Sequence, residues 1–136
     1  MKSIFRIPMR IHHGLLIMTE LAAVFKKKEL VTLEKIAEKE KISQGFLEEI
    51  ALALRRSNLI KGRRGPKGGY TLTQNPNKIS VSEILEALEG PVELVACLSA
   101  GNNCSTEKTC TNRKVWKRIQ DQITNTLDTI TLSDLI

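Results

Sequence analysis

The sequence predicts a mainly α-helical fold with one small β-hairpin and a long C-terminal helix. Apolar residues recur at helical spacing through the first 56 residues, a Gly- and Pro-rich turn separates two strand-like runs over residues 59–73, and a second helical stripe covers residues 115–130. At 136 residues, 41% of them hydrophobic, the chain has single-domain length and a modest core. No apolar run could span a bilayer or act as a signal peptide, which favours a cytoplasmic protein without membrane contact.

Three helices are expected before residue 57. The first covers residues 10–28 and ends in the lysines at 26–28, which we expect to be solvated cations near its C-terminus. Thr32 is the expected N-cap of the second helix and Ser43 that of the third, so a short turn joins these two helices as in a helix-turn-helix. The inward faces are expected to carry Ile11, Leu15, Met18, Ala22 and Phe25, then Leu33, Ile36 and Ala37, then Leu47, Ile50, Ala51 and Leu54.

The next segment predicts a hairpin and a fourth helix. Residues 59–64 and 70–73 resemble short strands around a turn rich in glycine. Ser80 and Glu83 have capping-box spacing at the start of the fourth helix, and Gly90 with the following proline ends it. A hairpin that follows a helix-turn-helix is a wing, so residues 1–92 are predicted to form a winged helix-turn-helix domain.

The C-terminal third is expected to hold an exposed loop and a dimerisation helix. Residues 93–112 are polar and carry all three cysteines, and residues 113–136 form the last helix and a tail. The small core could cover the apolar stripe of this helix only in part, so we expect a second copy to cover it in a homodimer. The stripe residues are Trp116, Ile119, Ile123, Leu127 and Ile130.

The charge distribution favours a polyanionic partner. Lysine and arginine outnumber the acids 21 to 15, and the stretch between Ile50 and Ser82 contains seven basic residues and no acid. Such a stretch is often a solvated surface hairpin, but a basic hairpin directly after a helix-turn-helix favours double-stranded DNA, whose phosphates the cations would neutralise. The seven residues are Arg55, Arg56, Lys61, Arg63, Arg64, Lys67 and Lys78.

The N-terminal end of the third helix is the expected base-reading surface. Ser43, Gln44, Gly45 and Glu48 are expected to be exposed there, where a recognition helix presents side chains to base edges. Gln44 is the best candidate for a direct base contact, because its amide both donates and accepts hydrogen bonds.

The cysteines form the candidate metal site. Cys97, Cys104 and Cys110 cannot all pair with one another, and their spacings lack the close pairs of structural zinc sites. Thiolates also bind iron-sulfur clusters. The spacing alone leaves open whether these residues hold a metal or are ordinary reduced thiols.

Several segments together resemble the Rrf2 family of bacterial transcription regulators. These segments are residues 13–22 (HGLLIMTELA), 42–49 (ISQGFLEE), 64–70 (RGPKGGY), 88–91 (LEGP) and 130–135 (ITLSDL). The resemblance implies a winged-helix homodimer that pairs through its long C-terminal helix. It also implies operator contacts by Ser43, Gln44, Gly45, Phe46 and Glu48, and entry of Arg64 into the minor groove.

The resemblance also implies a cofactor. Three cysteines in this loop mark the branches that hold an iron-sulfur cluster (2Fe-2S or 4Fe-4S), represented by IscR, NsrR and RirA. The IscR branch takes a fourth ligand from a histidine that is Arg113 in this sequence. Alignment with the NsrR branch instead gives His12 of the partner subunit as the candidate ligand, with Glu20 and Glu107 next.

Three functions are consistent with these features to different degrees. The first is a repressor or activator whose operator affinity follows a cluster that senses redox state, nitric oxide or iron status. The second is a cluster-free, thiol- or partner-responsive repressor of the CymR kind, against which the three-cysteine loop argues. An enzyme is the third, and it is disfavoured because the sequence lacks a phosphate-binding Gly-rich loop and a paired-carboxylate signature.

Overall fold

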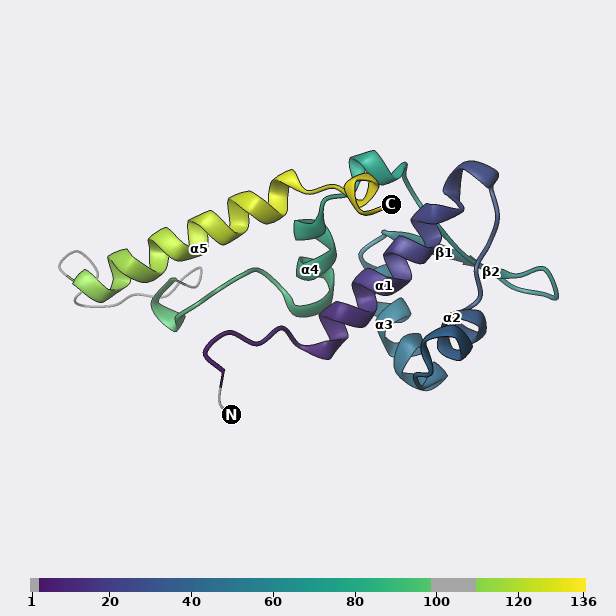
Figure 1. Cartoon of the computed structure of the whole chain (residues 1–136), viewed down its shortest axis with the longest axis horizontal. Helices are drawn as coiled ribbons and strands as arrows, with labels where there is room; N and C mark the ends of the chain where they lie inside the picture. The colour runs from purple at the N-terminus through teal and green to yellow at the C-terminus, as the bar shows by residue number, and fades with distance from the viewer. Residues whose placement is uncertain (1–2, 99–109) are drawn as a thin grey trace.

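The structure, a computed structural model, describes residues 3–98 and 110–136 (Figure 1). In these ranges five α-helices are connected by loops and short 3₁₀ turns, and one antiparallel hairpin follows α3. The mainly helical fold with a small hairpin is confirmed. The elements are α1 (Met9–Ala23), η1 (Phe25–Lys27), α2 (Leu33–Glu40), α3 (Gln44–Arg56), β1 (Ile60–Arg63), β2 (Gly69–Leu72), η2 (Pro76–Lys78), α4 (Val81–Glu89), η3 (Ala96–Leu98), α5 (Thr111–Thr129) and η4 (Leu132–Leu135).

One hydrophobic core lies around α1, which contacts α3, α4 and β2. Every residue expected to face inward from the second and third helices is buried, which confirms the helical periodicity there. No polar or charged residue among the described ones is buried, so the core depends on apolar packing alone. Its fully buried larger side chains include Ile17, Met18, Leu21, Ile36, Leu47, Ile50, Leu54 and Ile84.

The predicted helix starts are confirmed. The hydroxyl oxygens of Thr32, Ser43 and Ser80 each accept a hydrogen bond from the backbone N–H three residues ahead, at 3.2, 3.3 and 3.1 Å. Each therefore satisfies one of the N–H groups that lack a partner in a first helical turn. Gly90, with φ 85°, ends α4 as expected.

The first helix is shorter than predicted. It ends at Ala23, and a 3₁₀ turn follows that closes with Lys28 in the left-handed conformation at φ 57°. The chain must turn here so that Val31 can pair with Tyr70, whose backbone exchanges hydrogen bonds of 3.0 and 2.8 Å with that of Val31. This long-range pairing overrides the apolar pattern that continues to Phe25.

The hairpin is a wing that projects from the domain, as expected. Its strands pair from Ile60 with Leu72 to Arg63 with Gly69, and Val31 adds a single bridge on the outer side of β2. At Gly69, φ is 143° and a Cβ atom would lie 2.8 Å from the carbonyl oxygen of Val31. Glycine is therefore required at Gly69 by the approach of the chain's own backbone.

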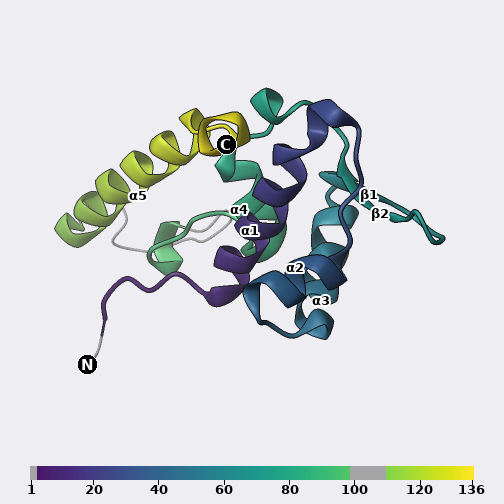
Figure 2. The same cartoon turned by 45° about the vertical axis from the view of Figure 1, so that its right-hand side comes forward.

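The last helix, α5, extends away from the domain, and none of its residues is buried (Figures 1 and 2). It ends at Thr129, so Ile130 lies just beyond it as its C-cap, a correction to the predicted helical stripe. The chain then returns to the core, where Leu132 is fully buried and its backbone N–H donates to the carbonyl oxygen of Ile79 at 2.8 Å. A periodic pattern does not reveal such a return, because the contact is made by η2, far away in the sequence.

Candidate nucleic-acid interface and cysteine site

The first turn of α3 presents an exposed polar surface. Ser43, Gln44, Gly45 and Glu48 are all exposed, and the Ser43 hydroxyl caps the helix through the N–H of Phe46. The Gln44 amide Nε2 donates to the Glu48 carboxylate at 3.4 Å, a long and weak hydrogen bond. An incoming hydrogen-bonding surface could therefore displace this contact at little cost.

Gly45 has open space beside it. A Cβ atom there would meet only the hydroxyl oxygen of Ser43, at 3.6 Å, which is an ordinary contact. Glycine in a helix costs about 1 kcal/mol relative to alanine. Packing within the chain does not require glycine at this position. The close approach of an external surface to the helix would require it.

Phe46 differs in exposure from the other residues that the resemblance places at the DNA. It is half-buried and packs against the core, and its ring meets that of His13 edge to face, with centroids 5.4 Å apart and an interplanar angle of 84°. His13 belongs to α1, so this contact couples the start of α3 to α1. No local sequence pattern predicts this pairing, because the two residues lie 33 positions apart.

The basic residues gather on one side of the molecule. Arg55 and Arg56 end α3, the wing carries Arg63, Arg64 and Lys67, and all five are exposed. The views in Figures 1 and 2 both place the wing beside the α2–α3 pair, on the side of the domain away from α5. The order of the elements in the sequence therefore produces one basic face in space.

Two grooves join α3 to the wing. One of about 410 Å³ is lined by Gln44, Glu48 and Arg55 from the helix, together with Tyr70 from β2. The other, of about 480 Å³, runs from Arg55 along β1 to the turn and also includes Tyr70. Helix and wing thus form a continuous surface, in which Glu48 of α3 and Glu34 of α2 are acidic side chains among exposed cations.

The cysteines lie at the opposite end of the molecule. Cys97 is in η3 and Cys110 is the N-cap residue of α5; both are half-buried and neither forms a disulfide. Element η3 contacts α5, and the backbone N–H of Leu94 donates to the Gln120 side chain at 2.9 Å. Cys104 lies outside the described residues, so its placement is not part of this geometry.

His12 is exposed on the first half of α1. Within residues 3–98 and 110–136, no three His, Cys, Asp or Glu side chains come together as a metal site, so His12 does not join Cys97 and Cys110 there. Glu20 is already engaged, because Lys39 approaches its carboxylate at 2.7 Å, and this hydrogen bond raises the pKa of Lys39. Glu107 lies outside the described residues.

Apolar side chains at the surface form a further feature, part of which the sequence had not indicated. The segment before α1 exposes Ile4, Phe5 and Ile7, with exposed fractions of 88, 61 and 63%. On α5, Val115 and Trp116 are exposed, and the remaining stripe residues are only half-buried.

No helix in the described part of the chain is both long and apolar enough to cross a membrane.

Comparison with known proteins gives consistent matches. The sequence profile of a family described as "Rrf2: Iron-dependent Transcriptional regulator" matches residues 7–136. The regulator CymR of Bacillus subtilis is 35% identical over 123 residues, which are 90% of this chain and 83% of CymR. IscR of Pectobacterium atrosepticum is 32% identical over 114 residues, which are 84% of this chain and 69% of IscR.

Solved structures agree with the sequence matches. The structure of CymR, described as the global cysteine regulator of B. subtilis, has a TM-score of 0.78 at 33% identity and covers 96% of this chain and 95% of CymR. The structure of T. potens IscR has a TM-score of 0.76 at 31% identity, covering 96% of this chain and 85% of IscR.

Proposed function

We propose, from the premise that the chain belongs to the Rrf2 family of DNA-binding transcriptional regulators, that an iron-sulfur cluster controls its affinity for an operator. Its relatives are transcription regulators rather than enzymes. The observation that carries the DNA-binding part is the continuous basic face of α3 and the wing. The exposed cations Arg55, Arg56, Arg63, Arg64 and Lys67 give this face its affinity for phosphates.

Base reading is assigned to the first turn of α3. A recognition helix inserts its N-terminal residues into the major groove, and there Gln44 would replace its weak bond to Glu48 by bonds to an adenine edge. Glu48 can accept from the amino group of cytosine. Gly45 and Ser43 let the backbone approach closely, while Arg64 at the wing would enter the minor groove.

A homodimer is proposed on the evidence of α5. This helix has 19 residues and none of them is buried, although it carries a helical apolar stripe. The exposed Ile4, Phe5 and Ile7 lie in the segment before α1 and add apolar surface. A second copy that covers both surfaces would place two α3 helices on one DNA face, as successive major grooves about 34–36 Å apart require.

The cysteine segment fits a thiolate-bound cluster. Cys97 and Cys110 are unpaired by disulfide and partly exposed, and they flank the segment that contains Cys104. The Cys110 side chain sits at the positive end of the α5 dipole and makes no capping hydrogen bond, which favours an anionic ligand there. When bound, an iron-sulfur cluster supplies iron that oxidants or nitric oxide can attack.

The proposed route from cysteine segment to DNA passes through α1. His12 of the partner subunit is the proposed fourth ligand. Its neighbour His13 packs against Phe46 in the first turn of α3, so a tether at His12 would hold the recognition helix in place. Release of the tether would let α1 and the first turn of α3 shift together, which changes operator affinity without an effector pocket.

A cluster-free regulator is the second candidate. Similarity to CymR, described as a global cysteine regulator, covers nearly the whole chain and is as strong as similarity to IscR. Such a regulator would respond through thiol chemistry or a protein partner. The two candidates differ in what Cys97 and Cys110 hold.

Two measurements on the wild-type protein separate the candidates. The protein is purified without oxygen, its iron and visible absorption are measured, and its operator is selected from random DNA duplexes. A coloured protein that holds iron and binds a palindromic duplex supports the proposal. A colourless, iron-free protein that binds such a duplex favours the second candidate, and failure to select any duplex contradicts both.

A further inference from the structure

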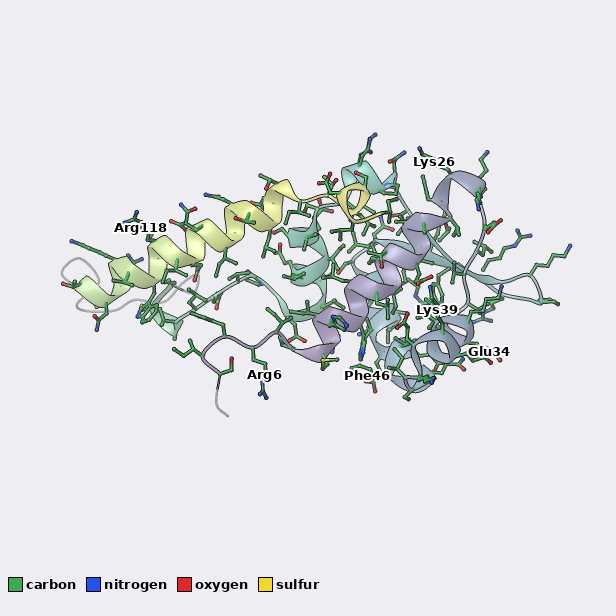
Figure 3. All side chains as sticks on the ribbon, viewed as in Figure 1. Arg6, Lys26, Glu34, Lys39, Phe46 and Arg118 are labelled. Atoms are coloured by element: carbon green, nitrogen blue, oxygen red, sulfur yellow. The ribbon has the colours of Figure 1, made fainter. Side chains whose placement is uncertain are left out.

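A basic cleft lies on the side of the wing away from the recognition helix. It has a volume of about 360 Å³, and its cations are Lys26 and Lys28 from the η1 turn and Lys61 from β1. We call it the lysine cleft. Figure 3 shows Lys26 on one side of the wing strands, with Glu34 of α2 and Phe46 of α3 on the other.

The cleft has the chemistry of a phosphate-binding surface. Phe25 and Leu72 contribute an apolar floor, along which lysine stems can lie while their ammonium groups stay in water. Thr71, which pairs with Lys61 across the wing, adds a hydroxyl donor. The side-chain oxygen Oδ1 of Asn75 accepts a hydrogen bond from the backbone N–H of Asn77. The side-chain amide nitrogen of Asn75 therefore remains available as a donor.

The backbone at Lys28 is left-handed, as it is at Lys41 and Asn58. Lys28 closes the η1 turn with φ 57°, a conformation that glycine adopts at lower cost. No salt bridge of Lys26, Lys28 or Lys61 occurs within the described residues. Glu29 is the single acid between residues 21 and 33, so the cleft keeps a clear positive charge.

We propose that Lys26, Lys28 and Lys61 bind the DNA backbone that flanks the operator beyond the wing. The minor groove is about 6 Å wide, so a wing that enters it has one phosphate backbone on each side. Arg55 lies on the α3 side of the wing and meets one backbone, whereas Lys26 and Lys28 line only the cleft on the other side. Lys61, in β1, lines both this cleft and the groove that contains Arg55. The inference rests on DNA binding by α3 and the wing.

The occupant is a polymer backbone rather than a small anion. Lysines carry point charges on flexible stems, which suit phosphates of varying position, whereas tight recognition of a small phosphate ligand favours the planar fork of arginine. The two solvated backbones of a duplex are also the anions nearest to an inserted wing. The proposal therefore extends the footprint outward and adds salt-dependent affinity without base specificity.

The test compares two duplexes and three variants. The long duplex carries one helical turn of arbitrary sequence on each side of the selected operator, and the short duplex ends at the operator edges. The test variant combines Lys26→Gln with Lys28→Gln and leaves Lys61 unchanged, because Lys61 also lines the groove between α3 and the wing. Lys27→Gln is the adjacent control, because Lys27 is exposed but does not line the cleft. A second control removes three cations from α5, by Lys114→Gln, Lys117→Gln and Arg118→Gln, at the far end of the molecule (Figure 3).

We expect the test variant to bind the long duplex at least about tenfold more weakly than wild type, with a salt slope lower by about 2 to 4, since up to two phosphate contacts per subunit are lost. On the short duplex it should match wild type, and both controls should match wild type on both duplexes. If the test variant binds the long duplex with the affinity and salt slope of wild type, the inference is overturned. An equal loss of affinity on the long and the short duplex would also overturn it. Wild-type protein that binds neither duplex overturns the DNA-binding proposal itself.

Discussion

The substitution Ile123→Glu tests whether α5 is the dimer interface. Ile123 belongs to the apolar stripe of α5 and is only half-buried within its own chain, so the folded monomer depends little on it. In a two-fold dimer the change places one carboxylate from each subunit in the apolar seam. Each buried, unpaired charge costs several kcal/mol, so the pair costs about 4–8 kcal/mol, which raises the dimer dissociation constant by about 10³- to 10⁶-fold.

Sedimentation velocity at micromolar protein measures this effect, and we expect monomers. The matched control is Gln122→Glu, which adds the same charge at the preceding position, where the side chain is exposed. It should remain dimeric. Circular dichroism checks that the Ile123→Glu monomer keeps its helices. A folded Ile123→Glu protein that sediments as a dimer would refute the assignment of this seam.

Three further substitutions test the DNA-binding face and the core. Arg64→Ala should weaken operator binding and lower the salt slope by about 2 per dimer, one contact being lost from each subunit; an unchanged slope in binding titrations would exclude a phosphate or groove contact by Arg64. Gln44→Ala should relax discrimination at one base pair by about 1–3 kcal/mol in competition assays, and a uniform loss on all DNA would show a backbone contact instead. Leu132→Ala should lower the free energy of unfolding by about 2–5 kcal/mol in urea titrations, because Leu132 is fully buried, whereas a loss below 1 kcal/mol would show that the C-terminal return adds little.

Local chemistry made the elements of the winged domain predictable. Thr32, Ser43 and Ser80 cap their helices because a hydroxyl before an apolar helical pattern satisfies a free N–H, whatever the tertiary structure. The apolar faces of α2 and α3 follow from helical periodicity in the same way. The basic face was predictable from composition, since seven cations without an acid lie in one short stretch.

Features that depend on distant partners were not predictable. The first helix ends at Ala23 because Val31 must reach Tyr70, and the final residues leave α5 so that Leu132 can pack beside Ile79. The contact between His13 and Phe46 belongs to the same class. Each joins residues more than 30 positions apart, so no local pattern encodes it.

The central claim is that a cluster held by the cysteine segment sets operator affinity. The most direct measurement compares wild type with Cys110→Ala after anaerobic reconstitution with iron and sulfide. For each protein, iron content and operator affinity are measured before and after removal of iron by a chelator. We expect wild type to hold iron and to change its operator affinity by about 5- to 150-fold on iron removal, while Cys110→Ala holds less iron and shows no change. Cys110→Ala protein that keeps full iron and the full change in affinity would contradict the account.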